Sequence, residues 1–225
     1  MEQRTDDWFK ARLGHLTASR ASDALAKQGT ATRRNYQIQL VTERLTGLQG
    51  DSFTNAAMQW GTEQEPVARA AYEVHTGHFV EQTGFHTHKS IKWLGASPDG
   101  FAGSGLIEIK CPNSNTHVDY LLAKEVPTKY KAQMLTQMLV TGRTWCDFVS
   151  FDPRLPEHLQ LFVIRYEPKP EELTKIEADL VAFLNEVNQM ELSLCQRNDR
   201  INQQEQEERE RRTPRLPRFS NDWRG

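Results

Sequence analysis

Apolar residues recur at helical spacing through the first fifty positions of the chain. A short helix is predicted over residues 6–13, because Thr5 can cap its start and Gly14 can end it. A second helix is predicted to begin at Ser19, and a third to end at Gly47. The apolar stripe of the third helix consists of Tyr36, Leu40, Val41 and Leu45.

A longer helical pattern occupies residues 55–75. Gly61 and Pro66 interrupt this pattern, and either residue can start a new helical segment or produce a kink. Gly77 is placed to end the helix. The first third of the chain is therefore predicted to be helical.

The pattern then changes to short runs of β-branched and aromatic residues bounded by Gly, Pro, Asn or Asp, which is typical of strands. These runs are residues 78–88, 92–101, 105–112, 145–153 and 159–168. Helices are predicted at residues 115–124 and 128–142, between the third and fourth runs, and a long helix at residues 171–194. This order predicts an α/β protein with a mixed central β-sheet flanked by helices.

Composition supports a globular protein, because 37% of the 225 residues are hydrophobic and 26% are charged. We expect a single domain over residues 1–195 and a charged tail over residues 196–225 that is either disordered or interface-forming. The three cysteines are far apart, and the sequence shows neither a signal peptide nor a run of about 20 apolar residues. The predicted location is the cytoplasm, without a membrane partner.

Charged residues interrupt the third predicted strand. Asp99 and Glu108 flank a short loop, so their segments can pair as a hairpin and bring both carboxylates to one end of the sheet. Because side chains alternate along a strand, Lys110 shares the face of Glu108, while Ile107 and Ile109 point to the opposite side. A divalent cation held by Asp99, Glu108 and the backbone carbonyl of Ile109 would compensate the buried charges.

Two interpretations fit Glu108 and Lys110 taken alone. The common one is an exposed ion pair on an amphipathic strand. Together with Pro98 and Asp99, however, the pair completes the pattern PD-(D/E)-x-K on two predicted strands followed by a helix, and this context favours a metal site.

Other polar residues can reach this site. Glu65 is a further candidate ligand, although alone it would be a solvent-facing helix acid. Tyr130 and Gln133 lie three residues apart on one helix face, which either joins the site or forms a half-exposed polar stripe.

A second candidate site lies near the N-terminus. Arg12 and Thr17 are close in sequence to Ser19, which is predicted to stand at a helix N-terminus, where hydroxyl groups, backbone amides and a guanidinium favour a phosphate. The alternative is a helix cap beside a surface arginine.

Four blocks of the sequence, in this order, resemble the phage lambda exonuclease family of alkaline nucleases, within the PD-(D/E)-x-K nuclease superfamily. They are DDWFKARLGHLTAS, WGTEQEPVARAAYE, ASPDGFAGSGLIEIKCP and YKAQMLTQMLVTGRTWCDFVSFDPR. The similarity extends from Trp8 to Tyr166 and thins out afterwards. The resemblance implies a restriction-endonuclease-like core.

The resemblance also implies an activity. It is that of a processive, Mg²⁺-dependent exonuclease that degrades one strand of duplex DNA from a 5′-phosphorylated end and leaves 3′ single-stranded overhangs for recombination by single-strand annealing. One or two Mg²⁺ ions per active site are implied, with Mn²⁺ as a substitute. A ring-shaped homotrimer, a single-strand annealing protein as partner, and a phage or prophage gene in a bacterial host are implied as well.

The implied residue roles follow the matching blocks. The catalytic set is Asp99, Glu108, Lys110, Gln133, Glu65 and Tyr130, and the set around the 5′ phosphate is Arg12, Thr17, Ser19 and Ser97. With a net charge of −2 the chain lacks a global basic character, but a closed ring retains DNA without neutralising its phosphates. Two alternatives stay open: an endonuclease or resolvase of the same superfamily, and a non-catalytic DNA-end-binding module.

Overall fold

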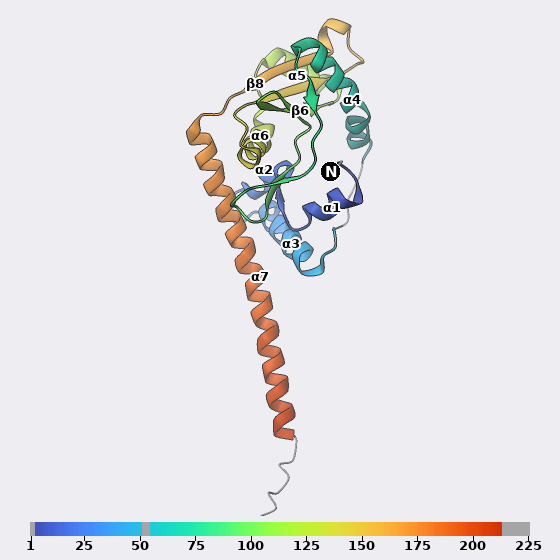
Figure 1. Ribbon diagram of the computed structural model, residues 1–225. Helices are drawn as coiled ribbons and strands as arrows, with labels where there is room; N and C mark the ends of the chain where they lie inside the picture. Colours follow the sequence, from blue (N-terminus) through green and yellow to red (C-terminus); the bar gives the residue numbers. More distant parts are fainter. Residues whose placement is uncertain (1–2, 51–54, 213–225) are drawn as a thin grey trace, which may run out of the picture. The chain divides into compact units, whose positions relative to one another are not determined.

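The structure is a computed structural model that describes residues 3–50 and 55–212 (Figure 1). Its elements, in chain order, are α1 (Asp6–Arg12), β1 (Leu16–Thr17), the 3₁₀ helix η1 (Ala18–Arg20), α2 (Ala21–Ala24), α3 (Ala31–Thr46), α4 (Ala56–Thr76), β2 (Val80–Glu81), β3 (His86–Thr87), β4 (Leu94–Ala96), β5 (Gly100–Ala102), β6 (Gly105–Lys110), α5 (Ser114–Ala123), α6 (Thr128–Thr141), β7 (Cys146–Phe151), the 3₁₀ helix η2 (Glu157–Leu159), β8 (Leu161–Tyr166) and α7 (Pro170–Arg212).

A five-stranded sheet in the order β2-β5-β6-β7-β8 forms the centre of the fold. Strands β6 and β7 are parallel, and the other pairs are antiparallel. The parallel pair is joined through α5 and α6, as a parallel connection requires. The predicted α/β class with a mixed sheet and flanking helices is therefore confirmed.

The hairpin of β5 and β6 is also as predicted. Gly100 pairs with Ile107 and Ala102 with Gly105, so the chain enters the hairpin from Asp99 at the level of Glu108. This register fixes the relative position of the two carboxylates.

Alternation along β6 separates an apolar face from a charged one. Ile107 and Ile109 belong to the buried apolar cluster that also contains Tyr72 of α4. The opposite face faces α6, where the ring of Tyr130 stacks on Phe148 of β7 at 5.4 Å between ring centroids. Helix α4 thus packs against β6, β7 and β8, while side chains of α6 contact Glu108 and Phe148 on the other face.

A second, three-stranded sheet in the order β1-β4-β3 packs against α6 and also contacts η1 and α2. Helix α3 packs beside the first part of α7, where Tyr36 stacks on Phe183 at 5.5 Å between centroids and Arg33 pairs with Glu186 at 2.8 Å. The predicted stripe on α3 is buried at Tyr36 but not at Leu45, which is 50% exposed.

Two predictions for the helices need correction. The second helix does not begin at Ser19, because Ser19 lies inside the 3₁₀ helix η1 and α2 starts only at Ala21. Helix α4 runs unbroken through Gly61 and Pro66, from an Asn55 cap whose Oδ1 accepts from Met58 N at 2.9 Å. The predicted ends at Gly47 and Gly77 are confirmed, and both glycines adopt left-handed φ angles of +66° and +72°.

The long C-terminal helix is longer than predicted. It continues to Arg212 instead of ending near Leu194, because Gln, Glu and Arg are good helix formers even where apolar residues are absent. The chain divides into two compact units at Val187, and the described part of the second unit is the continuation of α7 from Asn188. The domain limits at residues 195 and 196 stay a prediction, and residues 213–225 lie outside the described chain.

Within residues 3–50 and 55–212, none of the helices combines the length and the apolar character that crossing a membrane requires.

Candidate active site

Glu108 is buried at the centre of the site. None of its side chain is exposed, and Lys110, on the same face of β6, forms an ion pair with its Oε1. Two amides of α6 complete the contacts: Gln133 Nε2 donates to Oε1 at 2.7 Å, and Gln137 Nε2 donates to Oε2 at 2.6 Å. The interpretation of Glu108 and Lys110 as an exposed surface pair is therefore wrong.

Asp99 connects the entry of β5 to the middle of β6. Its Oδ2 accepts a hydrogen bond from the backbone amide of Ile109 at 2.7 Å. Burial raises the pKa of Asp99 well above its usual range, and the neighbouring carboxylates of Glu108 and Glu65 raise it further. The Lys110 ammonium lowers the pKa of Asp99 but does not offset these effects.

Lys110 is affected by the same carboxylates. Burial acts to lower the pKa of Lys110, but the charges of Glu108 and Asp99 outweigh burial and raise it above its usual range. Burial, with Glu65 and Asp99, also raises the pKa of the Cys111 thiol to about 12. Without a metal, Lys110 stays protonated, which suits positioning and charge stabilisation better than proton abstraction.

Tyr130 and Gln133 both reach this group from α6. Lys110 Nζ lies 5.2 Å from the centroid of the Tyr130 ring, which is within the range of a cation–π contact. Gln133 contacts Glu108 directly. The polar face predicted for this helix therefore meets the site rather than solvent.

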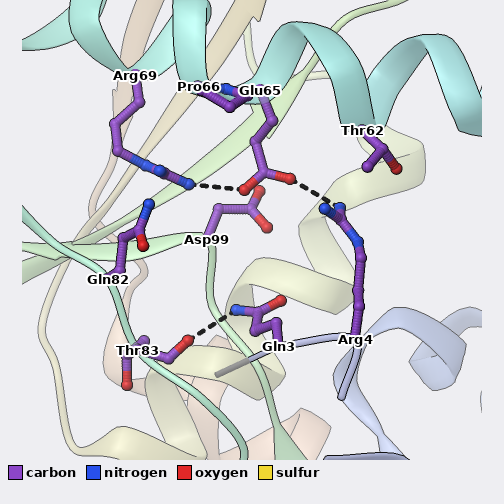
Figure 2. A pocket seen from close by; sticks show the side chains of 9 residues that line it. All are labelled: Gln3, Arg4, Thr62, Glu65, Pro66, Arg69, Gln82, Thr83 and Asp99. Atoms are coloured by element: carbon purple, nitrogen blue, oxygen red, sulfur yellow. Dashed lines mark hydrogen bonds and ion pairs between the residues drawn. The ribbon is translucent and has the colours of Figure 1, made fainter. Parts of the chain in front are cut away.

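Glu65 approaches from α4 and is held by two arginines. Arg69 Nη2 lies 2.7 Å from Glu65 Oε1, and Arg4 Nη2 lies 2.9 Å from Oε2. Figure 2 shows the Glu65 carboxylate between the two guanidinium groups, next to Asp99. Only 17% of the Glu65 side chain is exposed, so it is not the solvent-facing acid that its helix position alone suggests.

These side chains border a pocket of about 390 Å³, which we call the carboxylate pocket. It is lined by Gln3, Arg4, Thr62, Glu65, Pro66, Arg69, Gln82, Thr83 and Asp99. Asp99 is the residue at which this pocket meets the buried group of Glu108 and Lys110.

The fit to a divalent cation follows from the donor set. In the part of the chain that the structure describes, no three Asp, Glu, His or Cys side chains gather closely enough to hold a metal ion. The three carboxylates nevertheless act on each other electrostatically, since Glu108 and Glu65 both raise the pKa of Asp99. Hard oxygen donors of this kind suit a divalent cation, but Lys110, Arg69 and Arg4 balance the three carboxylates, so the site fits such an ion only once Glu65 leaves its arginines.

A second pocket, of about 580 Å³, lies beside α1 and α3 and includes three of the residues expected around a phosphate. We call it the arginine pocket; its lining includes Arg12, Thr17 and Ser19. Thr17 Oγ1 and Ser19 Oγ are 3.3 Å apart, and burial lowers the pKa of the Arg12 guanidinium. Three predicted neighbours therefore share one pocket, although no helix N-terminus stands at Ser19.

Ser97 contacts Arg12 of the arginine pocket and precedes Asp99 of the carboxylate pocket by two residues. Its Oγ accepts hydrogen bonds from Arg12 Nη1 at 3.2 Å and from Trp8 Nε1 at 2.9 Å. The Arg12 guanidinium also lies 4.0 Å from the centroid of the Trp8 ring. The predicted phosphate group and the carboxylates are therefore linked through one short stretch of backbone, residues 97–99.

Four further residues contact the predicted site residues: Gln137, Arg69, Arg4 and Trp8. Gln137 lies on the predicted polar face, four residues after Gln133, and that spacing is its signal. Arg69 follows Glu65 by four residues, which is a helix ion-pair spacing that the sequence shows. Arg4 and Trp8 act across long sequence separations, and no local pattern reveals their contacts.

The fold and the site together define a class. A restriction-endonuclease-like core carries Asp99 at the entry of one strand and Glu108 and Lys110 on the next, which is the arrangement of PD-(D/E)-x-K nucleases. Comparison with known proteins gives the family: the YqaJ-like viral recombinase domain matches residues 7–144. The chain belongs to this family, the lambda exonuclease family, and the resemblance seen in the sequence is confirmed.

Solved structures agree with this family. The alkaline exonuclease LHK-Exo from Laribacter hongkongensis is 45% identical, with a TM-score of 0.82 over 88% of this chain and 100% of that chain. LHK-Exo in complex with dAMP is 46% identical, with a TM-score of 0.83 over the same shares. A phage-related exonuclease from Haemophilus somnus is 16% identical, with a TM-score of 0.64 over 80% of this chain and 96% of that chain, and shows the fold alone. The comparison with curated proteins gave no match.

Membership of this family supports a nuclease role in recombination.

Proposed function

We propose that this protein is a Mg²⁺-dependent exonuclease that degrades one strand of duplex DNA processively from its 5′ end and leaves 3′ single-stranded overhangs. The observation that carries the proposal is the buried Glu108, which one cation and two amides hold beside Asp99 in a chain 46% identical to an exonuclease. A protein that only binds DNA ends has no use for this costly arrangement of buried charge.

Asp99 and Glu108 would hold one or two Mg²⁺ ions, with Glu65 and the Ile109 carbonyl as further oxygen ligands and Mn²⁺ as a substitute. Such an ion, when bound, supplies activation of the attacking water and stabilisation of the leaving 3′ oxygen. The chain itself supplies the fixed negative charges that attract the ion and the neutral amides that orient Glu108.

Lys110 acts as a positioning and charge-stabilising group. Its ammonium stays protonated beside Glu108 and under the Tyr130 ring, so it can hold the water or the scissile phosphate. Gln133 fixes Glu108 and, together with Tyr130, borders the same space. The water attacks phosphorus, and the bond from phosphorus to the 3′ oxygen breaks.

The arginine pocket would bind the 5′ phosphate through Arg12, Thr17, Ser19 and Ser97. Since Ser97 and Asp99 are two residues apart, a 5′ end anchored in this pocket brings a nearby phosphodiester to the carboxylates. This arrangement favours removal of short products from a 5′ end over cleavage at internal sites. The dAMP bound to LHK-Exo is in keeping with this substrate class.

Family membership extends the proposal to the assembly. We propose a ring-shaped homotrimer around DNA and a single-strand annealing protein as partner, in the cytoplasm of a bacterial host that carries the gene on a phage or prophage. A closed ring retains its substrate although the chain has a net charge of −2.

The test is digestion of a linear duplex labelled at either its 5′ or its 3′ ends, in Mg²⁺ and in EDTA. We expect early release of the 5′ label in Mg²⁺ and no release in EDTA. Lys110→Ala should abolish release while DNA binding is kept, and Lys175→Ala, at an exposed ion pair on α7, should behave as wild type. Early release of the 3′ label, or turnover by Lys110→Ala, would contradict the proposed polarity or the role of Lys110.

A further inference from the structure

A short segment before α1 lies across the carboxylate pocket. Gln3 and Arg4, which we call the N-terminal strap, both line this pocket. Gln3 Nε2 donates to the backbone oxygen of Thr83 at 2.9 Å (Figure 2). It also donates to the backbone oxygen of Pro98 at 2.8 Å. Since Pro98 directly precedes Asp99, the strap is tied to the backbone that carries a candidate metal ligand.

Arg4 makes the second attachment, to the candidate ligand on the other side of the pocket. Arg4 pairs with Glu65 Oε2 and Arg69 pairs with Oε1, so each carboxylate oxygen has its own guanidinium. Figure 2 shows this arrangement, with Asp99 beside Glu65. Both oxygens of Glu65 are therefore paired with cationic side chains of the protein itself.

The two arginines are not equivalent. Arg69 is on α4, four residues from Glu65, and only 12% of its side chain is exposed. The Arg4 side chain is 51% exposed, and its backbone has a φ of +67°, a region that residues other than glycine adopt at a cost. A half-exposed ion pair on a strained backbone is the easier one to break.

We propose that Arg4 is a positioning residue that serves as an internal counter-cation for Glu65, which a divalent cation must displace before Glu65 can become its ligand. The inference rests on the proposed function, because it takes Glu65 as a metal ligand. The N-terminal strap then neutralises the carboxylate pocket while no metal is bound, and its hold on Glu65 sets how tightly the metal binds.

The experiment is calorimetric titration of Mn²⁺, and of Mg²⁺, into the full chain without DNA. Arg4→Gln removes the competing cation, so we expect the metal affinity to rise roughly two- to five-fold, the range that an exposed ion pair supports. The gain should shrink at high NaCl concentration, because salt screens the pair that has been removed. Arg4→Lys keeps a cation and should stay close to wild type.

Two further variants separate the strap from general charge effects. Gln3→Ala releases the segment that carries Arg4, and we expect a smaller gain in metal affinity in the same direction. Lys175→Gln also removes one cation from an exposed ion pair, but its partner is Asp179, and the metal affinity should not change.

The outcomes distinguish this inference from the proposed function. If wild type binds the metal and Arg4→Gln binds it with equal or lower affinity, the counter-cation role is wrong and the proposed function stands. A gain of the same size in Lys175→Gln would also overturn the role, because the effect would then be non-specific. If wild type binds neither metal, the metal-dependent function itself is contradicted, and the role of Arg4 falls with it.

Discussion

At Asp99, burial and the neighbouring carboxylates disfavour the ionised side chain in the folded protein. Its pKa is raised by burial and by Glu108 and Glu65, so the folded protein binds this proton more tightly than the unfolded chain does. Stability of the metal-free protein must then fall as the pH rises through the folded-state pKa. The same electrostatic strain is what a bound cation would relieve.

Replacement of Asp99 by Asn tests this cost. We expect Asp99→Asn to raise the Tm of the metal-free protein at pH 8, because it removes a buried charge and its repulsion, while the Asn oxygen can still accept from Ile109. The gain should shrink as the pH is lowered, and Mg²⁺ should stabilise the variant less than wild type. Asp179→Asn, at an exposed pair, is the control. A gain that grows toward acid pH would refute the assignment.

The amide of Gln137 tests how Glu108 is held. Gln137→Met keeps the approximate shape but removes the donor to Glu108 Oε2, leaving a buried carboxylate with one partner fewer. We expect a loss of about 1–3 kcal/mol in the free energy of unfolding, measured by urea denaturation, together with reduced cleavage. Gln59→Met removes an exposed amide contact on α4 and should change stability by less than about 0.5 kcal/mol. Equal effects of the two variants would mean that Gln137 does not support Glu108.

Much of the site was predictable from the sequence, because its central residues are close together along the chain. Hairpin pairing and strand alternation alone bring Asp99, Glu108 and Lys110 together, and the structure has them in that arrangement. Arg4 was not predictable, because its contact with Glu65 spans 61 residues and depends on how the strap crosses the pocket. Local periodicity carries no information about such a contact.

At the scale of elements, the start of β6 is fixed by close packing. Gly105 lies against the indole of Trp145, and a Cβ added there would stand 2.1 Å from the ring. The ring cannot yield easily, because its other contacts include the guanidinium of Arg165 at 3.5 Å and a hydrogen bond to Ser104 Oγ at 3.1 Å. The strand that carries Glu108 therefore depends on a glycine at its first position.

Two glycine substitutions should have opposite effects on stability. Gly105→Ala forces the backbone or the Trp145 ring to move, and we expect a loss of about 1–3 kcal/mol. Gly61→Ala places a methyl group in open space within α4, and should stabilise the protein by about 0.5–1 kcal/mol. Thermal or urea unfolding measures both. A neutral Gly105→Ala would show that the packing around Trp145 is loose.

The elements that the sequence misjudged share a physical cause. Pro66 was expected as a break or a kink, yet α4 continues through it, since packing of its buried residues Ala68 and Tyr72 outweighs the local cost of a proline. Helix α7 continues past residue 194, because a lack of apolar residues predicts exposure rather than loss of helix. Tertiary packing and helix propensity determine where these two helices continue, and hydrophobic periodicity measures neither.

At the scale of the whole molecule, the contact between Arg12 and Ser97 links the arginine pocket to the backbone that carries Asp99. Arg12→Ala should therefore lower the preference for 5′-phosphorylated over 5′-hydroxyl duplex ends by roughly ten-fold or more, the value of a lost charge-assisted contact. Arg20→Ala changes the same pocket, but its guanidinium is paired with Asp23, and a smaller effect is expected. Initial rates on the two kinds of end give the ratio. An unchanged preference in Arg12→Ala would mean that the arginine pocket does not bind the 5′ phosphate.

A metal-dependent exonuclease that needs a DNA end must leave DNA without ends intact. The most direct measurement is digestion of linear, 5′-phosphorylated duplex DNA beside covalently closed circular DNA of the same sequence, each with Mg²⁺ and with EDTA. We expect loss of the linear duplex alone, only with Mg²⁺, and accumulation of single strands. Nicking of the circle would indicate an endonuclease or resolvase, and binding of linear DNA without cleavage would indicate an end-binding module; either result would rule out the proposed exonuclease.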